Sequence, residues 1–365
     1  MSSKRRVMRA VTPEERLQRN NFDLIRLLLA ATVCLVHVWE LSGFAALAWL
    51  GEIFSSRVAV SAFFVISGFL IFRSFERSAS HKAYAIKRFR RIYPAYACVI
   101  ILSAVGLFFV STVPAKTYFS LAWLEYLLAN LVFLNFLQPD LPGVFNGNEL
   151  TAVNGALWTL KIEVMFYMAV PVLIWLARRF GPFPVLLSGY VLSLLYTYAL
   201  QDHGEQTGAE FYIRLAHQLP GQLSYFLAGA FFHYFLELFV RRVTVFVVPA
   251  VLVLVLDQFY LLPTFVPFAL ATLVIFFGLF CYVGDFGKYG DFSYGVYIVH
   301  FPIIQVLLAS QIFAGQPWML LLSVTILTAV SGILLWHLVE KRFLRRDSHY
   351  IAGSGGADIP TARPV

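Results

Sequence analysis

The chain has 365 residues, of which 59% are hydrophobic, 17% aromatic and 13% charged, and its mean hydropathy is +0.74. About a quarter of the residues of a typical soluble domain are charged, so this composition excludes a soluble globular enzyme. Lys and Arg outnumber Asp and Glu by 28 to 20, which gives a net charge of +8. Apolar segments cover nearly the whole length, and we predict an all-α protein that crosses a membrane many times.

The apolar segments divide the chain into three parts. We predict a basic cytoplasmic tail at 1–21, a transmembrane domain at 22–342 and a disordered cytoplasmic tail at 343–365. About ten transmembrane helices are expected, near 22–42, 54–74, 93–113, 156–177, 183–200, 218–240, 243–261, 264–284, 292–312 and 317–339.

The distribution of basic residues predicts the orientation of these helices. With the N-terminus in the cytoplasm, 23 of the 28 Lys and Arg residues fall in inward-facing segments, as the positive-inside rule requires. Both termini are then cytoplasmic. The apolar segment 118–137 would reverse everything downstream if it crossed the membrane, so we expect it to be re-entrant or interfacial. The polar segment 138–155 then forms a large outward loop that could cover an outer mouth.

The first predicted helix carries ionisable residues within an apolar segment, where such groups are costly. Asp23 and Arg26 are one turn apart, and His37 lies about three turns further along the same face. One interpretation is structural: Asp23 and Arg26 pair near the inner interface, and His37 packs against a carbonyl. The other is catalytic: His37 is a general base, and Arg26 stabilises negative charge deeper in a channel.

The second span and the segment after it offer two further candidates. Ser67 could line a narrow tunnel, although Ser67 and Gly68 also suit close helix packing. The following stretch, expected as a loop, places basic residues just before a helix start at Tyr93–Pro94. Three interpretations are open: the loop sets the membrane topology, binds lipid headgroups, or binds a phosphate-rich cofactor such as coenzyme A. Its basic residues are Lys82, Lys87, Arg88, Arg90 and Arg91.

Two later spans each align polar residues on one helix face. Thr159, Glu163 and Tyr167 recur every fourth residue in the fourth span. Glu163 either forms a structural pair with Arg26 or His37, or orients His37 as its carboxylate partner. In the ninth span, packing and function are equally consistent with the alignment of Ser293, Tyr297 and His300.

Two features near the ends of spans have simpler interpretations. Glu340 is expected to be an interfacial anchor. Cys34, Cys98 and Cys281 lie in apolar segments without CxxC spacing, so we expect neither disulfides nor a metal site.

Five strings in this order resemble the acyltransferase-3 family of bacterial multipass O-acyltransferases, across roughly residues 18–342. They are D-x-x-R-x10-H at Asp23–His37, FF-x-x-SG-x-L at Phe63–Leu70, R-x-x-R at Arg88–Arg91, WTL-x-x-E-x-x-FY at Trp158–Tyr167 and SY-x-x-Y-x-x-H-x-P at Ser293–Pro302. Ala59 and Ser61 depart from the Gly and Asp common in the family, which puts its usual second-span polar contact in doubt.

The resemblance implies a membrane-bound transferase that moves an acyl group, most simply acetyl, from cytoplasmic acyl-CoA to a hydroxyl of a glycan or glycolipid at the outer face of the inner membrane. It implies that His37 is the general base, assisted by Asp23, Arg26 and Glu163. The acyl group would pass either directly to the acceptor or through an acyl-histidine intermediate. Acyl-CoA is a co-substrate, no cofactor is permanently bound and no nucleic acid is a partner. The implied acyl-CoA-binding residues are Lys87, Arg88, Arg90, Arg91 and Tyr93, and those of the tunnel or acceptor side are Ser67, Tyr167, Ser293, Tyr297 and His300.

Two other classes fit the composition. A proton-coupled exporter of sugars or small metabolites also carries ionisable residues within the membrane, but no internal repeat is evident here. A non-catalytic membrane scaffold is the other. Consumption of an acyl-CoA thioester would distinguish the transferase from both.

Overall fold

The computed structural model describes residues 12–260 and 262–344, and within these ranges it is all-helical, without strands. Most of the two predicted tails, at 1–11 and 345–365, lies outside the described residues. The longer helices are α2 (Phe22–Ser42), α4 (Ser56–Glu76), α5 (His81–Gly106), α7 (Leu121–Leu131), α8 (Trp158–Phe180), α9 (Pro182–Thr207), α11 (Leu219–Tyr234), α13 (Val243–Tyr260), α14 (Val266–Phe280), α15 (Ser293–Ala309) and α16 (Pro317–Leu335). Shorter helices are α1 (Pro13–Gln18), α3 (Trp49–Ile53), α6 (Ala115–Tyr118), α10 (Glu210–Ala216), α12 (Leu236–Arg241) and α17 (Lys341–Phe343), and a π-helix covers Trp336–Glu340.

Seven helical segments of the described residues are long and apolar enough to cross a membrane, which agrees with a multi-pass membrane protein. The other three predicted spans form the shorter helices α11, α14 and α15, of 15 to 17 residues. A bilayer core needs about 20 helical residues, so the expected count of ten spans stays a prediction. The segment expected to be re-entrant or interfacial contains α7, which has only 11 residues.

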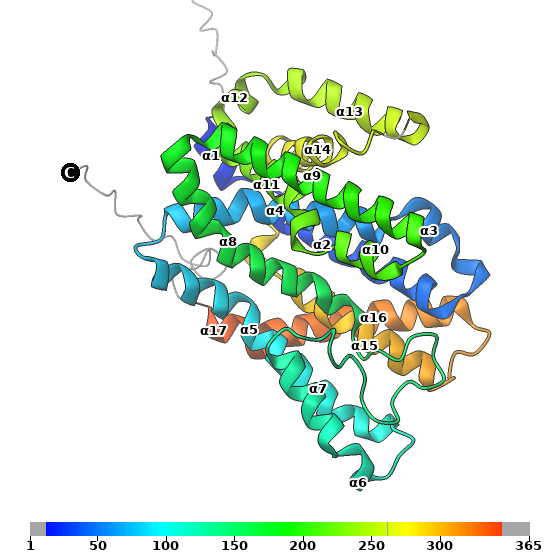
Figure 1. The fold of residues 1–365 in the computed structure, drawn as a ribbon. Coiled ribbons are helices and arrows are strands. Elements are labelled where there is room, and N and C mark those ends of the chain that lie inside the picture. The colour runs from blue at the N-terminus through cyan, green and yellow to red at the C-terminus, as the bar shows by residue number, and fades with distance from the viewer. Residues whose placement is uncertain (1–11, 261, 345–365) are drawn as a thin grey trace, which may run out of the picture.

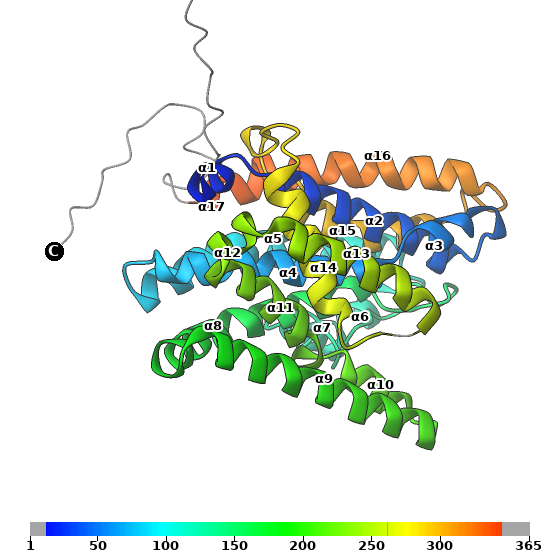
Figure 2. The same ribbon diagram turned by 90° about the horizontal axis from the view of Figure 1, so that it is seen from above.

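The long helices run side by side between two ends of the molecule (Figures 1 and 2). α1, α12 and α17 lie at one end, and α3 and α10 lie at the other. More than half of the residues of α4 and of α15 are buried: α4 contacts α2, α8, α11 and α14, while α15 contacts α2, α5 and α16. α13 lies at the periphery and packs mainly on α14, whereas α6 and α7 project from the opposite side of the bundle (Figure 1).

Two glycines allow α4 and α11 to pack backbone against backbone. A Cβ atom on Gly68 would lie 1.9 Å from the carbonyl oxygen of Phe226, and one on Gly229 would lie 2.1 Å from that of Val65. Gly68 therefore serves helix packing, and its neighbour Ser67 is left to face the other side of α4.

The basic stretch after α4 is not the expected loop. It forms the first turns of α5, which begins at His81 because the Ser80 side chain accepts a hydrogen bond of 3.1 Å from the Ala83 backbone N–H. The helix then continues through Pro94, where the sequence predicted its start. A regular helix here places Arg88 and Arg91 on one face.

Prolines within two other helices free carbonyl groups that side chains satisfy. Pro171 in α8 cannot bond the carbonyl of Tyr167, and the Tyr84 hydroxyl donates to that oxygen at 3.1 Å. Pro302 in α15 likewise frees the carbonyl of Ile298, which accepts a hydrogen bond of 2.9 Å from the Asn154 side chain. These bonds attach α5 to α8 and the segment before α8 to α15.

Candidate active site

An open cavity of about 560 Å³ lies at the end of the bundle near α1 and α17. We call it the entrance cavity. Its volume is within the range of small-molecule and cofactor sites, roughly 300–1,000 Å³. One carboxylate, that of Asp23, and seven basic side chains line it: Arg26, Arg73, Arg77, Lys87, Arg88, Arg90 and Arg91. The excess of positive charge suits a polyanionic ligand, and guanidinium groups bind phosphate with paired hydrogen bonds.

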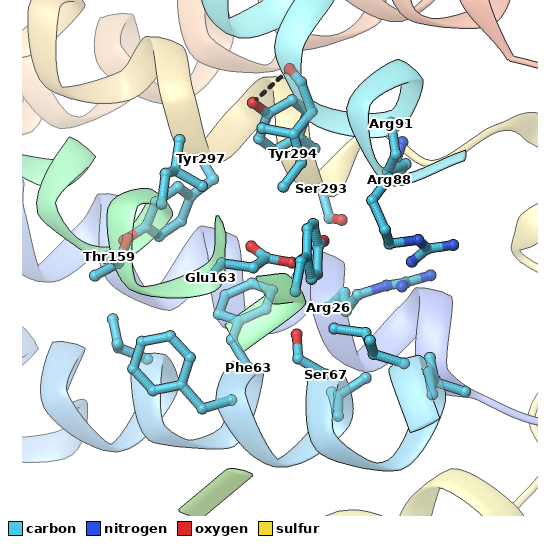
Figure 3. Close-up of a pocket in the computed structure, with 18 residues that line it drawn as sticks. Arg26, Phe63, Ser67, Arg88, Arg91, Thr159, Glu163, Ser293, Tyr294 and Tyr297 are labelled. Atoms are coloured by element: carbon cyan, nitrogen blue, oxygen red, sulfur yellow. Dashed lines mark hydrogen bonds between the residues drawn. The ribbon is translucent and has the colours of Figure 1, made fainter. Parts of the chain in front are cut away.

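A smaller pocket of about 130 Å³ follows deeper in the bundle, between α2, α4, α5, α8 and α15. We call it the inner pocket. It shares Arg26, Leu70, Arg88 and Arg91 with the wall of the entrance cavity, so the two spaces adjoin. Figure 3 shows Arg26 and Arg88 at one end of this pocket, Thr159 with Tyr297 at the other, and Glu163 between them. Apolar side chains such as Phe63 and Ile71 complete the wall.

Two of the three arginines at this border, Arg26 and Arg91, are held by a cluster of carboxylates. Arg26 pairs with Asp23 one turn earlier, and its guanidinium group lies 3.4 Å from Asp291. Arg91 pairs with Asp291 and with Glu340, the latter at 3.0 Å. Asp291 and Glu340 are almost completely buried. Glu340 is therefore not the interfacial anchor that its position at the end of a span predicts.

Asp291 lies just before α15 and is the centre of this cluster. Burial alone raises the pKa of its carboxyl group, but the guanidinium groups of Arg26 and Arg91 and two hydrogen bonds from Ser293 outweigh burial and lower the pKa to about 2. Asp291 is therefore ionised at neutral pH. Because its pKa falls on folding, its ionisation stabilises the folded state above about pH 4, and this contribution is lost as the pH falls toward 2.

We expect Asp291→Asn to destabilise the protein, because two buried guanidinium groups lose a shared counter-charge. Removing one partner of a buried ion pair costs about 3–5 kcal/mol. Thermal unfolding of the purified protein in detergent measures the effect. Glu237→Gln is the matched control, since Glu237 pairs with Arg241 at an exposed site and should leave the melting temperature nearly unchanged. An Asp291→Asn protein with the same melting temperature as wild type would contradict this role of Asp291.

His37 lies beyond the Thr159 end of the inner pocket, paired with a second histidine. Its Nδ1 is 2.8 Å from Nε2 of His300, and its Nε2 is 3.8 Å from the carboxylate of Glu40. The edge of the Phe301 ring contacts the His37 ring, with centroids 5.5 Å apart. His300 is completely buried, whereas the side chain of His37 is 18% exposed.

Hydroxyl groups connect the inner pocket to this histidine pair. Thr159 and Tyr297 share a hydrogen bond of 2.7 Å in the pocket wall. The Tyr297 ring also contacts His300 one turn further along α15, with centroids 5.8 Å apart. A chain of side-chain contacts therefore connects the wall of the inner pocket, through Tyr297 and His300, to His37.

The structure does not bring Glu163 to His37. The Glu163 carboxylate accepts a hydrogen bond of 2.6 Å from the Tyr167 hydroxyl in the inner pocket, and among the described residues the polar partners of His37 are His300 and Glu40. Glu163 therefore does not orient the His37 ring, contrary to the expectation from the sequence; His300 contacts this ring instead. Glu163 instead places a negative charge in the pocket wall that also carries Arg26 and Arg88.

The other predicted residues divide into four groups. Ser67, Tyr167, Ser293 and Tyr297 line the inner pocket, and Lys87 and Arg90 line the entrance cavity. Arg26, Arg88 and Arg91 line both cavities. Tyr93 is outside both walls: its ring stacks on Phe89 with centroids 4.6 Å apart.

The sequence does not predict two residues of the site, Glu40 and Asp291. It indicates Thr159 but does not predict the hydrogen bond between Thr159 and Tyr297. Glu40 follows His37 by one helical turn, a spacing visible in the sequence. Asp291 directly precedes an apolar span two residues before Ser293, but nothing local indicates that it meets Arg26 and Arg91.

Comparison with known proteins agrees with this arrangement. The acyltransferase-3 family model, described as an acyltransferase domain, matches residues 19–337. A protein named O-acetyl transferase from Shigella phage Sf6 is 31% identical over 350 residues, covering 90% of this chain and 97% of that protein. Nodulation protein 10 of Rhizobium leguminosarum bv. viciae is 32% identical over 174 residues, covering 44% of this chain and 46% of that protein. No solved structure matches the chain. The family match covers the helices that form the inner pocket and the histidine pair, and the chain is therefore a membrane acyltransferase of the acyltransferase-3 family.

Proposed function

We propose that the protein transfers an acetyl or other short acyl group from acyl-CoA to a hydroxyl group of a glycan or glycolipid, with donor and acceptor approaching from opposite sides of the membrane. One observation carries this proposal: a strongly basic cavity adjoins a narrow pocket, and Tyr297 in the wall of that pocket contacts a histidine paired with His37. Coenzyme A has matching parts, since its phosphates are anionic and its pantetheine arm is narrow.

The donor enters at the basic end, which we assign to the cytoplasm. Phosphates of acyl-CoA bind the exposed side chains of Lys87 and Arg90 together with the arginines around them. Arg88 stands at the border of the two cavities, where its guanidinium group donates to the Ser74 hydroxyl at 3.2 Å and lies over the Tyr167 ring. The pantetheine arm then passes Arg88 and occupies the inner pocket. The positive-inside rule supports this orientation, because most basic residues of the chain fall on the same side.

The reaction takes place at the histidine pair. His37 removes the proton of the acceptor hydroxyl as its oxygen attacks the thioester carbonyl, and a new C–O bond forms. The hydroxyl groups of Thr159 and Tyr297 stabilise the negative charge on the carbonyl oxygen. The C–S bond then breaks, and the proton held by His37 passes to the departing CoA thiolate. Direct transfer of this kind needs no acyl-enzyme intermediate.

The acceptor approaches from the other side of His37. Glu40, one turn beyond His37, has a side chain that is 45% exposed, so this face of α2 is open. The predicted outward loop is attached to α15 by Gln305, whose side chain donates to the carbonyls of Leu150 and Ala152 at 2.6 and 2.9 Å. This attachment holds the loop at the end of α15 beyond His300, as expected for a wall of the acceptor site.

Release of free CoA thiol tests the proposal. Purified protein in lipid vesicles, given acetyl-CoA and glycans extracted from the host cell surface, should release thiol only when the glycans are present. An exporter or a scaffold does not break a thioester. Absence of thiol release, with acetyl-CoA intact by mass spectrometry, would contradict the proposal.

A further inference from the structure

The two ring nitrogens of His37 face different surroundings. Nδ1 points to the completely buried His300, at 2.8 Å from its Nε2. Nε2 points toward Glu40, whose carboxylate is 3.8 Å away and whose side chain is 45% exposed. The nitrogen on the open side of α2 is therefore Nε2, the one that an incoming hydroxyl group can reach.

A hydrogen bond between two neutral imidazoles requires one donor and one acceptor, and its direction fixes both tautomers. If His300 donated, the lone pair of His37 would be used at Nδ1 and its proton would sit on Nε2. The exposed nitrogen would then be unable to accept a proton. If His37 donates from Nδ1, its Nε2 carries a lone pair and can act as a base, since the Glu40 carboxylate at 3.8 Å is beyond hydrogen-bond distance and does not require a proton on Nε2.

The surroundings of His300 favour the second arrangement. Its Nδ1 is buried and meets no partner with normal hydrogen-bond geometry among the described residues. The backbone carbonyls of Val296 and Tyr297, one turn earlier on α15, are polar groups that interact with the ring. Carbonyl oxygens only accept, so a proton on Nδ1 of His300 is favoured over a lone pair there. With its proton on Nδ1, His300 offers Nε2 as the acceptor.

The rings are also held in place. The Phe301 ring meets the His37 ring edge to face, at an interplanar angle of 82°. Gly155 leaves room for Phe301, because a Cβ atom there would lie 2.7 Å from that ring. The Asn154 side chain bonds the α15 carbonyl freed by Pro302 and so attaches the same turn of α15 to the segment before α8.

We propose that His300 is a positioning residue: it accepts the Nδ1 proton of His37 and thereby presents the Nε2 lone pair of His37 to the acceptor hydroxyl. The inference rests on the proposed role of His37 as general base. His300 acts through His37, in the way that a carboxylate fixes the histidine tautomer of a serine protease, where the wrong tautomer costs about 10⁴-fold in rate.

Two substitutions at His300 separate positioning from packing. His300→Phe keeps a planar ring but removes the acceptor, and we expect kcat to fall at least about 100-fold with the KM for acetyl-CoA within about threefold of wild type. His300→Gln places an amide oxygen near the former Nε2 position, and we expect it to recover at least about a tenth of the wild-type kcat. Equal activity of the Phe and Gln variants, or a kcat for His300→Phe near that of wild type, would overturn the inference.

The tautomer itself gives a readout that does not depend on activity. Solid-state NMR of the ¹⁵N-histidine-labelled wild-type protein in bilayers observes eight histidines, and the His37 signals are those lost in His37→Gln. We expect a protonated Nδ1 and an unprotonated Nε2 at neutral pH. A protonated Nε2 in the wild type would overturn the inference. A fully active His37→Ala protein would instead refute the proposed function. The tautomer of His37 is measured in the wild-type protein, so the two proposals can fail separately.

Discussion

Replacing His37 by Ala should reduce acyl transfer to less than about a hundredth of the wild-type rate. A positioned general base contributes about 10²–10⁴-fold, and His37 is the base of the proposed mechanism. Thiol release from acetyl-CoA in the presence of acceptor measures the rate. The KM for acetyl-CoA should change little, because the proposed site of the CoA phosphates is near Lys87 and Arg90, which line the entrance cavity, whereas His37 does not.

His203→Ala is the control for this substitution, since His203 is exposed and lines neither cavity. It should retain the wild-type rate and show that removing a histidine does not by itself disturb the fold. Matching expression and melting temperature of His37→Ala would exclude misfolding. A correctly folded His37→Ala protein with more than about a tenth of the wild-type rate would refute the role of His37 as base.

Replacing Lys87 and Arg90 together by Ala should raise the KM for acetyl-CoA about tenfold or more and leave the KM for the acceptor unchanged. Hydrogen bonds to charged groups contribute roughly 1.5–3 kcal/mol, and a loss of about 1.4 kcal/mol corresponds to a tenfold weaker complex. Arg91 is unsuitable for this test, because its loss would remove a guanidinium partner from both buried carboxylates, Asp291 and Glu340. Added salt should also weaken acetyl-CoA binding to the wild type, because the phosphate contacts are screened.

The control for this pair is the double substitution of Arg178 and Arg179 by Ala. These residues are also basic and exposed, at the end of α8, but line neither cavity. Their removal lowers the net charge equally and should leave the KM for acetyl-CoA near that of wild type. Equal increases in KM for the two double variants would mean that only overall charge matters and that the phosphates bind elsewhere.

The sequence predicts the membrane helices well because apolar length and charge asymmetry are local properties. Seven of the ten predicted spans match long apolar helices, and the other three coincide with α11, α14 and α15. The stripe of Asp23, Arg26 and His37 on α2 follows directly from helical periodicity, and the structure places Asp23 and Arg26 in the wall of the entrance cavity and His37 beside His300.

The start of α5 shows how two local signals can compete. Pro94 suggested a helix start, because proline is favoured in the first turn of a helix. The Ser80 side chain instead caps the helix, so α5 begins at His81 and accommodates Pro94 in its interior. The basic residues expected in a loop are therefore helical, and helical spacing decides which of them face the entrance cavity.

Partners far apart in sequence leave no local signal. Asp291 meets Arg91 across 200 positions, and His300 meets His37 across 263. Glu163 was expected beside His37 because both lie near the outer ends of their predicted spans, yet its carboxylate bonds Tyr167 on its own helix. The position of a residue along its helix is predictable from the sequence, whereas the rotation of each helix about its axis depends on packing.

Mass spectrometry of surface glycans tests the central claim most directly. Glycans would be compared from cells that lack the protein, cells that express it and cells that express His37→Ala. The account predicts an added acyl mass, removed by mild alkali as an ester, only in cells with the wild-type protein. The same acyl content in all three glycan samples would contradict the account.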